Sequence, residues 1–336
     1  MLDTLPTVAT PATAAFDAAD AANQIAGART RAEFIAACRA VVDASLHVRL
    51  RPKRLRRAHD LVSAATPISW AWYVRPEPET LSDAAFDLVA LAAPNGGYFY
   101  TTPDGGVAQW AHEGSGTKAL HRWTQDLARD RLLPGVDLHD PETARRKIAP
   151  RLEGVPYASS RLEIAADLAR AQRRARLDAL LDAARTPNGT WRLTLEVADH
   201  LAAIYPAAFA EDPFRKKAIL ALIMLHGYLH NAGERVESDL PLPADYQLPR
   251  IFNFLGALEI APELTATLRS GDRLLDVESP EVVSLRAAAV VLAARLAQDT
   301  EQPDGVVDGA LFTTYRKDPA FLVDSLPAMR CDTLWF

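Results

Sequence analysis

The chain has 336 residues, 49% of them hydrophobic and 24% charged, a balance typical of a globular protein rather than a fibrous or disordered one. The formal net charge of −6 argues against binding duplex nucleic acid through many phosphates, a role that usually needs a basic excess. Two cysteines, Cys38 and Cys331, exclude a disulfide scaffold and favour a cytoplasmic setting. We expect no secretory signal and no membrane span, because the N-terminus lacks a basic region and no apolar run is long enough.

The first part of the chain lacks the pattern of a folded domain. Residues 1–25 are mainly small and polar and include prolines, so we expect a disordered N-terminal segment ahead of one domain over residues 26–336. The residues that follow place apolar side chains at the i, i+3, i+4 spacing of amphipathic helices. This spacing predicts helices at Thr30–Ser45 and Arg54–Ala64.

The stretch from Ser69 to Gln109 is the main part of the chain without a helical pattern. Residues 68–74 alternate between apolar and small side chains, as a short strand does. Residues 95–106 contain two glycine turns on either side of an aromatic segment, which is typical of a hairpin. We therefore predict a small β-hairpin region near residues 68–110.

Helical spacing resumes after this region. Start signals support two of the helices, namely Pro262 with Glu263, and Ser279 followed by Pro280 and Glu281. Glycine is sparse, at 16 residues, and no linker or internal repeat divides the chain, so we predict a single, mainly α body. The further predicted helices are Ala119–Asp130, Ser160–Ala184, Leu193–Ile204, Asp212–His230, Gln247–Leu255, Ala261–Ser270 and Ser279–Asp299.

Several short motifs within residues 190–336 resemble, in order and at similar spacing, those of the queuosine salvage proteins. The strongest match is PADYQLPRI at residues 243–251, continuing to LGAL at residues 255–258, which resembles the family signature ADYRLPQ…LGAL. The other matches are FRKKA at 214–218, SPEVVSLRA at 279–287, VDGALF at 307–312 and the aromatic end of the chain from residue 329.

That family is all-helical, with a fold similar to that of DNA glycosylases, and it hydrolyses queuosine 5′-phosphate to release the base queuine. The resemblance implies a hydrolase that cleaves the N-glycosidic bond of a 7-deazapurine nucleotide, a small-molecule substrate, without a cofactor. The sequence departs from the family where the base is held: Gln247 replaces an arginine, Met224 and His226 replace an aspartate and a tryptophan, and residues 90–97 lack an aromatic motif. We therefore predict a base that differs from queuine or is held differently.

The resemblance assigns catalysis to Asp245 and Lys216. Cleavage of an N-glycosidic bond builds positive charge on the ribose, and a buried carboxylate beside the reacting carbon stabilises that charge. Asp245 takes this role by resemblance, although an aspartate just before a helix is most often an N-cap. Lys216 would keep the carboxylate ionised and bind substrate oxygens, whereas composition alone predicts that Lys216 and Lys217 face water.

Four further residues are expected to bind the substrate. Asp308 either binds a hydroxyl or a ring N–H of the substrate or caps the helix that follows it, and the two interpretations have equal weight. Tyr246 lines the pocket or belongs to the core, and Arg330 clamps the phosphate or forms a surface ion pair. His226 would offer the base one hydrogen bond and some stacking.

Other chemistries find less support in the sequence. His226 and His230 have the i, i+4 spacing of metal ligands on a helix, but no glutamate or cysteine accompanies them, so we predict a structural or pocket feature and no metal site. The sequence contains no P-loop, GxGxxG or Ser–His–Asp pattern. Four tryptophans offer stacking surfaces for a base, although core packing is their more common use: Trp70, Trp72, Trp110 and Trp123.

Two other functions fit the same motifs. One is an N-glycosidase that acts on a different modified nucleotide, and the other is a catalytically inactive helical binding protein on the same scaffold. The pocket distinguishes an enzyme from a binding protein. An enzyme should gather Asp245, Lys216 and Asp308 around one cavity, whereas a binding protein would leave them apart or fill the cavity with side chains.

Overall fold

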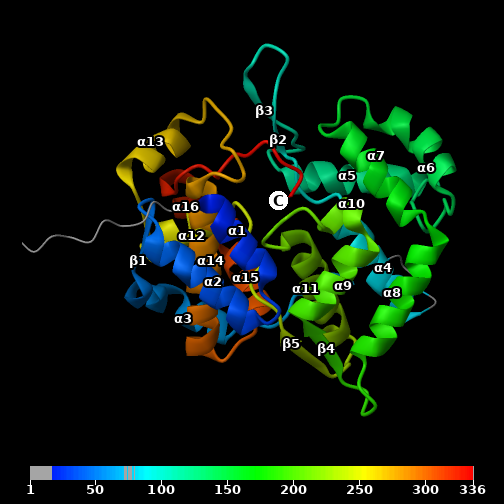
Figure 1. The fold of residues 1–336 in the computed structure, drawn as a ribbon, viewed down its shortest axis with the longest axis horizontal. Helices are drawn as coiled ribbons and strands as arrows, with labels where there is room; N and C mark the ends of the chain where they lie inside the picture. Colours follow the sequence, from blue (N-terminus) through cyan, green and yellow to red (C-terminus); the bar gives the residue numbers. More distant parts are fainter. Residues whose placement is uncertain (1–16, 72–73, 75–77, 79, 336) are drawn as a thin grey trace, which may run out of the picture.

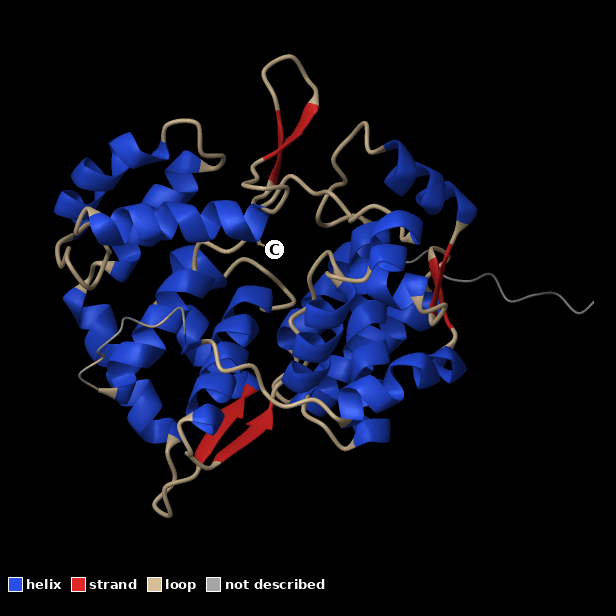
Figure 2. Cartoon of the chain, turned by 180° about the vertical axis from the view of Figure 1, so that it is seen from behind, coloured by secondary structure: helices blue, strands red, loops and turns tan. Residues whose placement is uncertain are grey.

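The computed structural model describes residues 17–71, 74, 78 and 80–335 of the chain. These residues form sixteen α-helices and three two-stranded sheets, so the predicted mainly α fold is confirmed. The helices gather into two lobes, one built from both ends of the chain and the other from its middle (Figure 1). The short sheets lie at the edges of the helical body (Figure 2).

Both ends of the chain build the first lobe. α1 (Ala18–Gly27), α2 (Arg31–Ala44) and α3 (Arg56–Ser63) pack against the long α14 (Pro280–Thr300), which is buried on nearly every side, as a central core helix is. β1 pairs antiparallel with β6, which ties the N-terminal segment to the C-terminal part. The other elements are β1 (Val48–Leu50), η1 (Pro52–Leu55), α12 (Leu248–Phe254), β6 (Leu258–Ile260), α13 (Pro262–Ser270), α15 (Asp304–Tyr315) and α16 (Pro319–Asp324).

The middle of the chain builds the second lobe around α11 (Lys216–Asn231), which packs against α4 (Leu81–Ala92) and α9 (Leu195–Ile204). β2 and β3 form an antiparallel hairpin, and β4 and β5 pair in parallel. The other elements are β2 (Phe99–Thr101), β3 (Val107–Gln109), α5 (Gly116–Arg129), α6 (Pro141–Ile148), η3 (Ala149–Leu152), α7 (Ala158–Leu168), α8 (Ala171–Ala184), β4 (Trp191–Thr194), α10 (Pro206–Phe209) and β5 (Val236–Asp239).

The region predicted to be non-helical differs in part from the structure. The hairpin of β2 and β3 is present. The strand predicted at residues 68–74 is absent from the described residues, because Ile68–Trp70 have no regular structure, Ala71 is part of a helical turn and Val74 is a bend. Residues 72 and 73 of the predicted strand lie outside the described residues. α4 also occupies part of this stretch. It begins with a capping box between Thr80 and Asp83. Apolar residues surround most of the helix, so the sequence does not show the i, i+3, i+4 spacing of an amphipathic helix.

The predicted disordered segment is wrong for residues 18–25, which belong to α1; residues 1–16 lie outside the described residues. α1 is held because Ile25 is fully buried and because the Arg215 guanidinium donates hydrogen bonds to three carbonyl oxygens near the end of the helix. The donor–acceptor distances are 2.6–3.1 Å, and the acceptors are Ile25, Ala26 and Ala28.

A buried ion pair joins the two lobes. Arg286 of α14 donates from Nη1 and Nη2 to the two carboxylate oxygens of Asp212, at 2.8 and 2.7 Å, and both side chains are buried. Arg286 also donates from Nε to the carbonyl oxygen of Ala244, at 3.0 Å, and Asp212 accepts from the backbone N–H of Lys216, at 2.9 Å. The pair therefore fixes the start of α11 against the residue that precedes Asp245.

Replacement of Arg286 by methionine should lower the free energy of unfolding by about 3–5 kcal/mol, because it leaves the Asp212 carboxylate buried without its partner. Urea unfolding followed by circular dichroism measures the change. Arg295→Met is the matched control on the same helix, since the Arg295 pair with Asp299 is solvent-exposed and should contribute only about 0.5 kcal/mol. Equal losses in the two variants would contradict this account of the buried pair.

Candidate functional site

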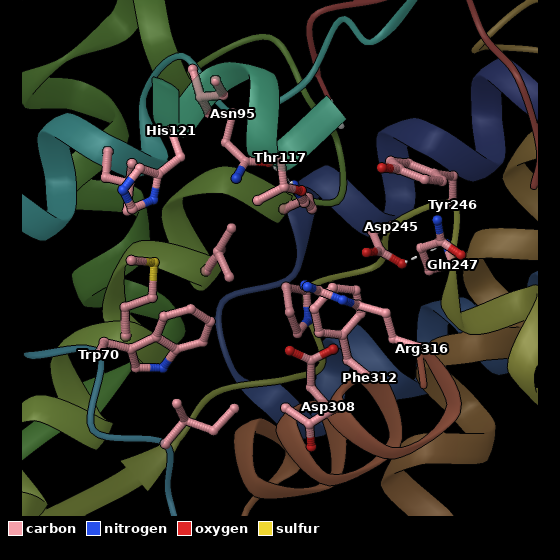
Figure 3. A pocket seen from close by; sticks show the side chains of 18 of the residues that line it. Trp70, Asn95, Thr117, His121, Asp245, Tyr246, Gln247, Asp308, Phe312 and Arg316 are labelled. Carbon is pink, nitrogen blue, oxygen red and sulfur yellow. Dashed lines mark hydrogen bonds between the residues drawn. The ribbon is translucent and has the colours of Figure 1, made fainter. Parts of the chain in front are cut away.

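A cavity of about 200 Å³ is lined by residues of both lobes. α5, α11 and the segment after α4 contribute one side, and α15 with the loop of residues 243–247 contributes the other. Figure 3 shows this arrangement, with the acidic side chains facing the cavity from the side of α15 and the loop. Side chains do not fill the cavity.

Lys216, Asp245 and Asp308 all line this cavity, and we call them the charged group. They come from the start of α11, the loop before α12 and the middle of α15, so only the tertiary fold brings them together. Burial raises the pKa of both carboxyl groups, and the Lys216 ammonium opposes this shift in each of them. The three groups therefore act as one electrostatic unit.

Asp245 is fixed by the backbone that follows it. Its Oδ1 accepts hydrogen bonds from the N–H groups of Gln247, at 2.8 Å, and Leu248, at 3.1 Å, where α12 begins. Burial raises the pKa of Asp245, while Lys216 and these two N–H donors favour the ionised carboxylate. The N-cap interpretation is wrong, because the N-cap residue of α12 is Gln247; Asp245 instead fixes the turn that leads into the helix, and its carboxylate points into the cavity (Figure 3).

Both lysines of the charge run are buried, each only 4% exposed, so the expectation that they face water is wrong. The Nζ of Lys216 donates to Oδ1 of Asn95, at 2.8 Å, and the Nζ of Lys217 donates to the carbonyl oxygen of Ala93, at 2.9 Å. Burial lowers the pKa of both, to about 7 for Lys217. Lys217 lines a different cavity, so Lys216 alone joins the charged group.

Asp308 is not the N-cap of a helix, which corrects one of its two interpretations. α15 already begins at Asp304, and Asp308 lies one turn inside it with its side chain at the cavity. No hydrogen bond to the Asp308 carboxyl is made by the described part of the chain. Burial, with the neighbouring Asp245, raises the pKa of Asp308 to about 8. The site therefore contains two different carboxyl groups: Asp308 keeps its proton at neutral pH, whereas the neighbours of Asp245 favour its ionised form.

Tyr246 lines the cavity, as one of its two interpretations predicts. Its ring also packs edge to face against Tyr98 and Phe99, with centroid distances of 6.3 and 6.0 Å. Burial raises the pKa of the Tyr246 hydroxyl, so it remains protonated over the whole physiological range. Tyr246 thus belongs both to the cavity wall and to the packing around it.

His226 and Arg330 do not line the cavity, and the structure does not support their predicted contacts with the substrate. The cavity face of α11 carries Lys216, Leu220 and Met224 at i, i+4 spacing, and His226 lies off this face. His226 is buried, with its pKa lowered to about 4 by burial and by His230. Arg330 donates to the Gly271 carbonyl oxygen, at 3.0 Å.

Trp70 and His121 lie across the cavity from Asp245 and Asp308 (Figure 3). With Thr117 and Met224, which also line the cavity, they form what we call the neutral wall. Thr117 and His121 lie one turn apart on α5 and present the same face of that helix. Burial lowers the pKa of His121, which keeps its imidazole neutral at physiological pH. Gly227 permits this wall to form, because a Cβ there would overlap the carbonyl oxygen of Ile68.

Sequence reasoning missed several residues of this cavity. Asn95 falls in the segment that aligns with the family's base-pocket motif, and Gln247 falls at the family's arginine, so both positions carried a signal. No sequence motif marks Thr117 or His121, because their proximity to α11 depends on tertiary packing. No motif marks Arg316, at the end of α15, either; its guanidinium lies 5.5 Å from the centroid of the Phe312 ring.

Comparison of the chain with protein-family models and with curated proteins finds no match. The described residues contain no group of three or more His, Cys, Asp or Glu side chains arranged to hold a metal ion. None of the helices in the described part of the chain combines the length and the apolar character that crossing a membrane requires. Any function must therefore be argued from the cavity and the sequence motifs.

Asp308→Asn should change the stability of the protein in a pH-dependent way. The pKa of Asp308 is raised from 3.8 to about 8, so its contribution to stability is lost as the pH rises toward 8. The free energy of unfolding of the variant minus that of the wild type should therefore increase between pH 4 and pH 8 and stay constant above pH 8. Urea titrations at several pH values measure this difference.

Asp324→Asn, at the exposed end of α16, is the control for removal of one carboxylate. A difference between Asp308→Asn and the wild type that stays constant across this pH range would show that Asp308 is not a desolvated carboxyl.

Proposed function

We propose that the protein is a hydrolase that cleaves the N-glycosidic bond of a 7-deazapurine nucleoside 5′-phosphate and releases the free base. The observation that carries the proposal is the meeting of Asp245, Lys216 and Asp308 at one cavity. The same three residues lie in motifs that resemble those of queuosine salvage proteins. The proposal includes a helical body of the DNA-glycosylase-like kind, which the mainly α architecture supports.

Asp245 is the group proposed to stabilise the transition state. As the bond between C1′ and the base nitrogen breaks, its electron pair leaves with the base and positive charge develops on the ribose. The Asp245 carboxylate, held by two backbone N–H donors and by Lys216, faces the cavity where that charge would develop. A water molecule then adds to C1′ and gives up one proton, which Asp245 accepts and passes to solvent.

Asp308 is proposed to supply the proton that the leaving base needs. A 7-deazapurine lacks the N7 atom that purine hydrolases protonate, so the base must gain its proton elsewhere on the ring. Two neighbouring carboxyl groups whose environments separate their pKa values are suited to opposite roles, one ionised and one protonated. The pKa of Asp308, about 8, makes it the donor of the pair. After the base has left, Asp308 takes a proton from solvent and is again able to act as a donor.

The phosphate-binding role that we expected of Arg330 is assigned in this proposal to Arg316. Arg316 lines the cavity and is exposed, and it is the only guanidinium among the described lining residues. Guanidinium groups bind phosphate with two parallel hydrogen bonds. In Figure 3 its side chain extends toward the space between Asp245 and Asp308, on the side where a ribose phosphate would lie.

Asp245→Asn should reduce base release by about 10²-fold or more, because the uncharged amide no longer stabilises the cationic ribose. The measurement is chromatographic detection of free base from a panel of 7-deazapurine nucleoside 5′-phosphates that includes queuosine 5′-phosphate. The fold should be retained, since an asparagine side chain still accepts from the two N–H groups at the start of α12. Near-normal turnover in this variant would remove Asp245 from the mechanism.

Lys216→Ala should abolish base release, whereas Lys217→Ala should leave the turnover of the folded protein largely unchanged. The two variants are closely matched, because both lysines are buried and each donates one hydrogen bond to the segment of residues 93–95. Any loss of stability should therefore be similar in the two variants, which differ in that only Lys216→Ala removes the ammonium group from the cavity. Turnover per folded molecule is the measurement, and equal losses would place the site elsewhere.

The rate of base release should fall as the pH rises through about 8, where Asp308 loses its proton. The dependence of kcat/KM on pH reports this ionisation in the free enzyme. Asp308→Asn should be slow and should lack the alkaline decline, because its amide has no proton to lose. A wild-type rate that rises through this range would assign Asp308 the role of a base.

A further inference from the structure

We infer that the neutral wall, with Asn95, binds the base of the substrate and selects an uncharged bicyclic base that carries a carbonyl oxygen over a base that carries a cationic arm. This inference rests on the proposed function and specifies the substrate class of the same site. It concerns Trp70, Thr117, His121 and Met224, which the proposed chemistry does not use.

The acidic side chains of the cavity lie apart from the neutral wall. The carboxyl groups that line it, among the described residues, are those of Asp245 and Asp308, and both lie across the cavity from Trp70 and His121 (Figure 3). Because Asp245 must face the ribose and Asp308 the edge of the base next to the bond that breaks, the rest of the base extends toward the neutral wall. An ammonium placed there would lose its hydration without gaining a carboxylate partner, which is strongly unfavourable.

The neutral wall offers a base a stacking surface. Trp70 and Met224 both line the cavity, and an indole ring stacks on any flat heteroaromatic base. The thioether of Met224 adds a polarisable apolar contact at the same side. The close approach of the Ile68 backbone to Gly227 holds Trp70 against α11, so its indole packs against the core although its backbone belongs to a loop.

Asn95 sets the hydrogen-bonding character of the base. The Lys216 ammonium is only a donor, so the Asn95 oxygen must face it, at 2.8 Å. The amide nitrogen of Asn95 is then the group left to the cavity, and it offers N–H donors. In Figure 3 Asn95 lies above the cavity between His121 and Thr117, which add a neutral imidazole and a hydroxyl. A donor at this position requires an acceptor on the base, such as a ring carbonyl oxygen.

Binding of free bases tests this inference independently of catalysis. Isothermal titration calorimetry of the wild-type protein is carried out with 7-deazaguanine, 7-cyano-7-deazaguanine and 7-aminomethyl-7-deazaguanine, and 7-deazaadenine serves as the analogue without a carbonyl oxygen. The cyano and aminomethyl compounds are matched in size and differ in charge. We expect the neutral carbonyl bases to bind at least 10-fold more tightly than the aminomethyl base and than 7-deazaadenine. Equal or tighter binding of the aminomethyl base overturns the inference.

Substitution of the neutral wall adds a second arm. Met224→Asp places a carboxylate on the wall and should shift the ratio of affinities toward the aminomethyl base by at least 10-fold, whereas Met224→Leu should keep the wild-type ratio. An unchanged ratio in a folded Met224→Asp variant contradicts the inference, and the wild-type comparison stands if this variant does not fold. Selective binding of neutral bases without base release from any nucleotide would reject the proposed hydrolysis and keep the inference.

Discussion

The buried ion pair between Arg286 and Asp212 is the constraint on which the rest of the site depends. One guanidinium in the core helix α14 holds both oxygens of a carboxylate in the opposite lobe and the carbonyl oxygen of Ala244. The Arg286 guanidinium thereby fixes the start of α11 and the loop that carries Asp245 to each other. Buried charges are costly unless they are fully paired, so this arrangement permits little relative movement of the lobes.

The charged group uses the rigidity that this pair provides. Lys216 and Asp308 are both desolvated, and burial shifts the pKa of each toward its neutral form. A folded protein tolerates such groups only where the surrounding structure prevents them from reaching water. The site is therefore a place where stability is given up, which is typical of residues selected for chemistry rather than for folding.

The sequence predicts the helical body well, because amphipathic spacing and capping residues are local properties. It fails where local pattern and tertiary environment diverge. α4 is apolar around much of its surface, so its spacing is unclear, although the Thr80 capping box marks its start. α1 has the composition of a disordered segment, yet the distant Arg215 holds it through three carbonyl oxygens. Residue separations of this size are invisible to a local pattern.

The site shows the same division. Motif order identified Asp245, Lys216 and Asp308, and the structure brings them to one cavity. Position in a motif did not give side-chain direction, so His226 and Arg330 were assigned to a cavity that they do not line. The neutral wall could not be predicted, because Thr117 and His121 on α5 meet Met224 on α11 only after the chain has folded.

The most direct test of the central claim is product analysis of a reaction run in water enriched in heavy oxygen. The substrate is a 7-deazapurine nucleoside 5′-phosphate, and mass spectrometry follows the base and the sugar phosphate separately. Hydrolysis at C1′ predicts an unlabelled free base and a ribose 5-phosphate that has gained one heavy oxygen atom from water. Intact nucleotide after prolonged incubation with folded protein that binds it would contradict hydrolysis and identify a binding protein instead.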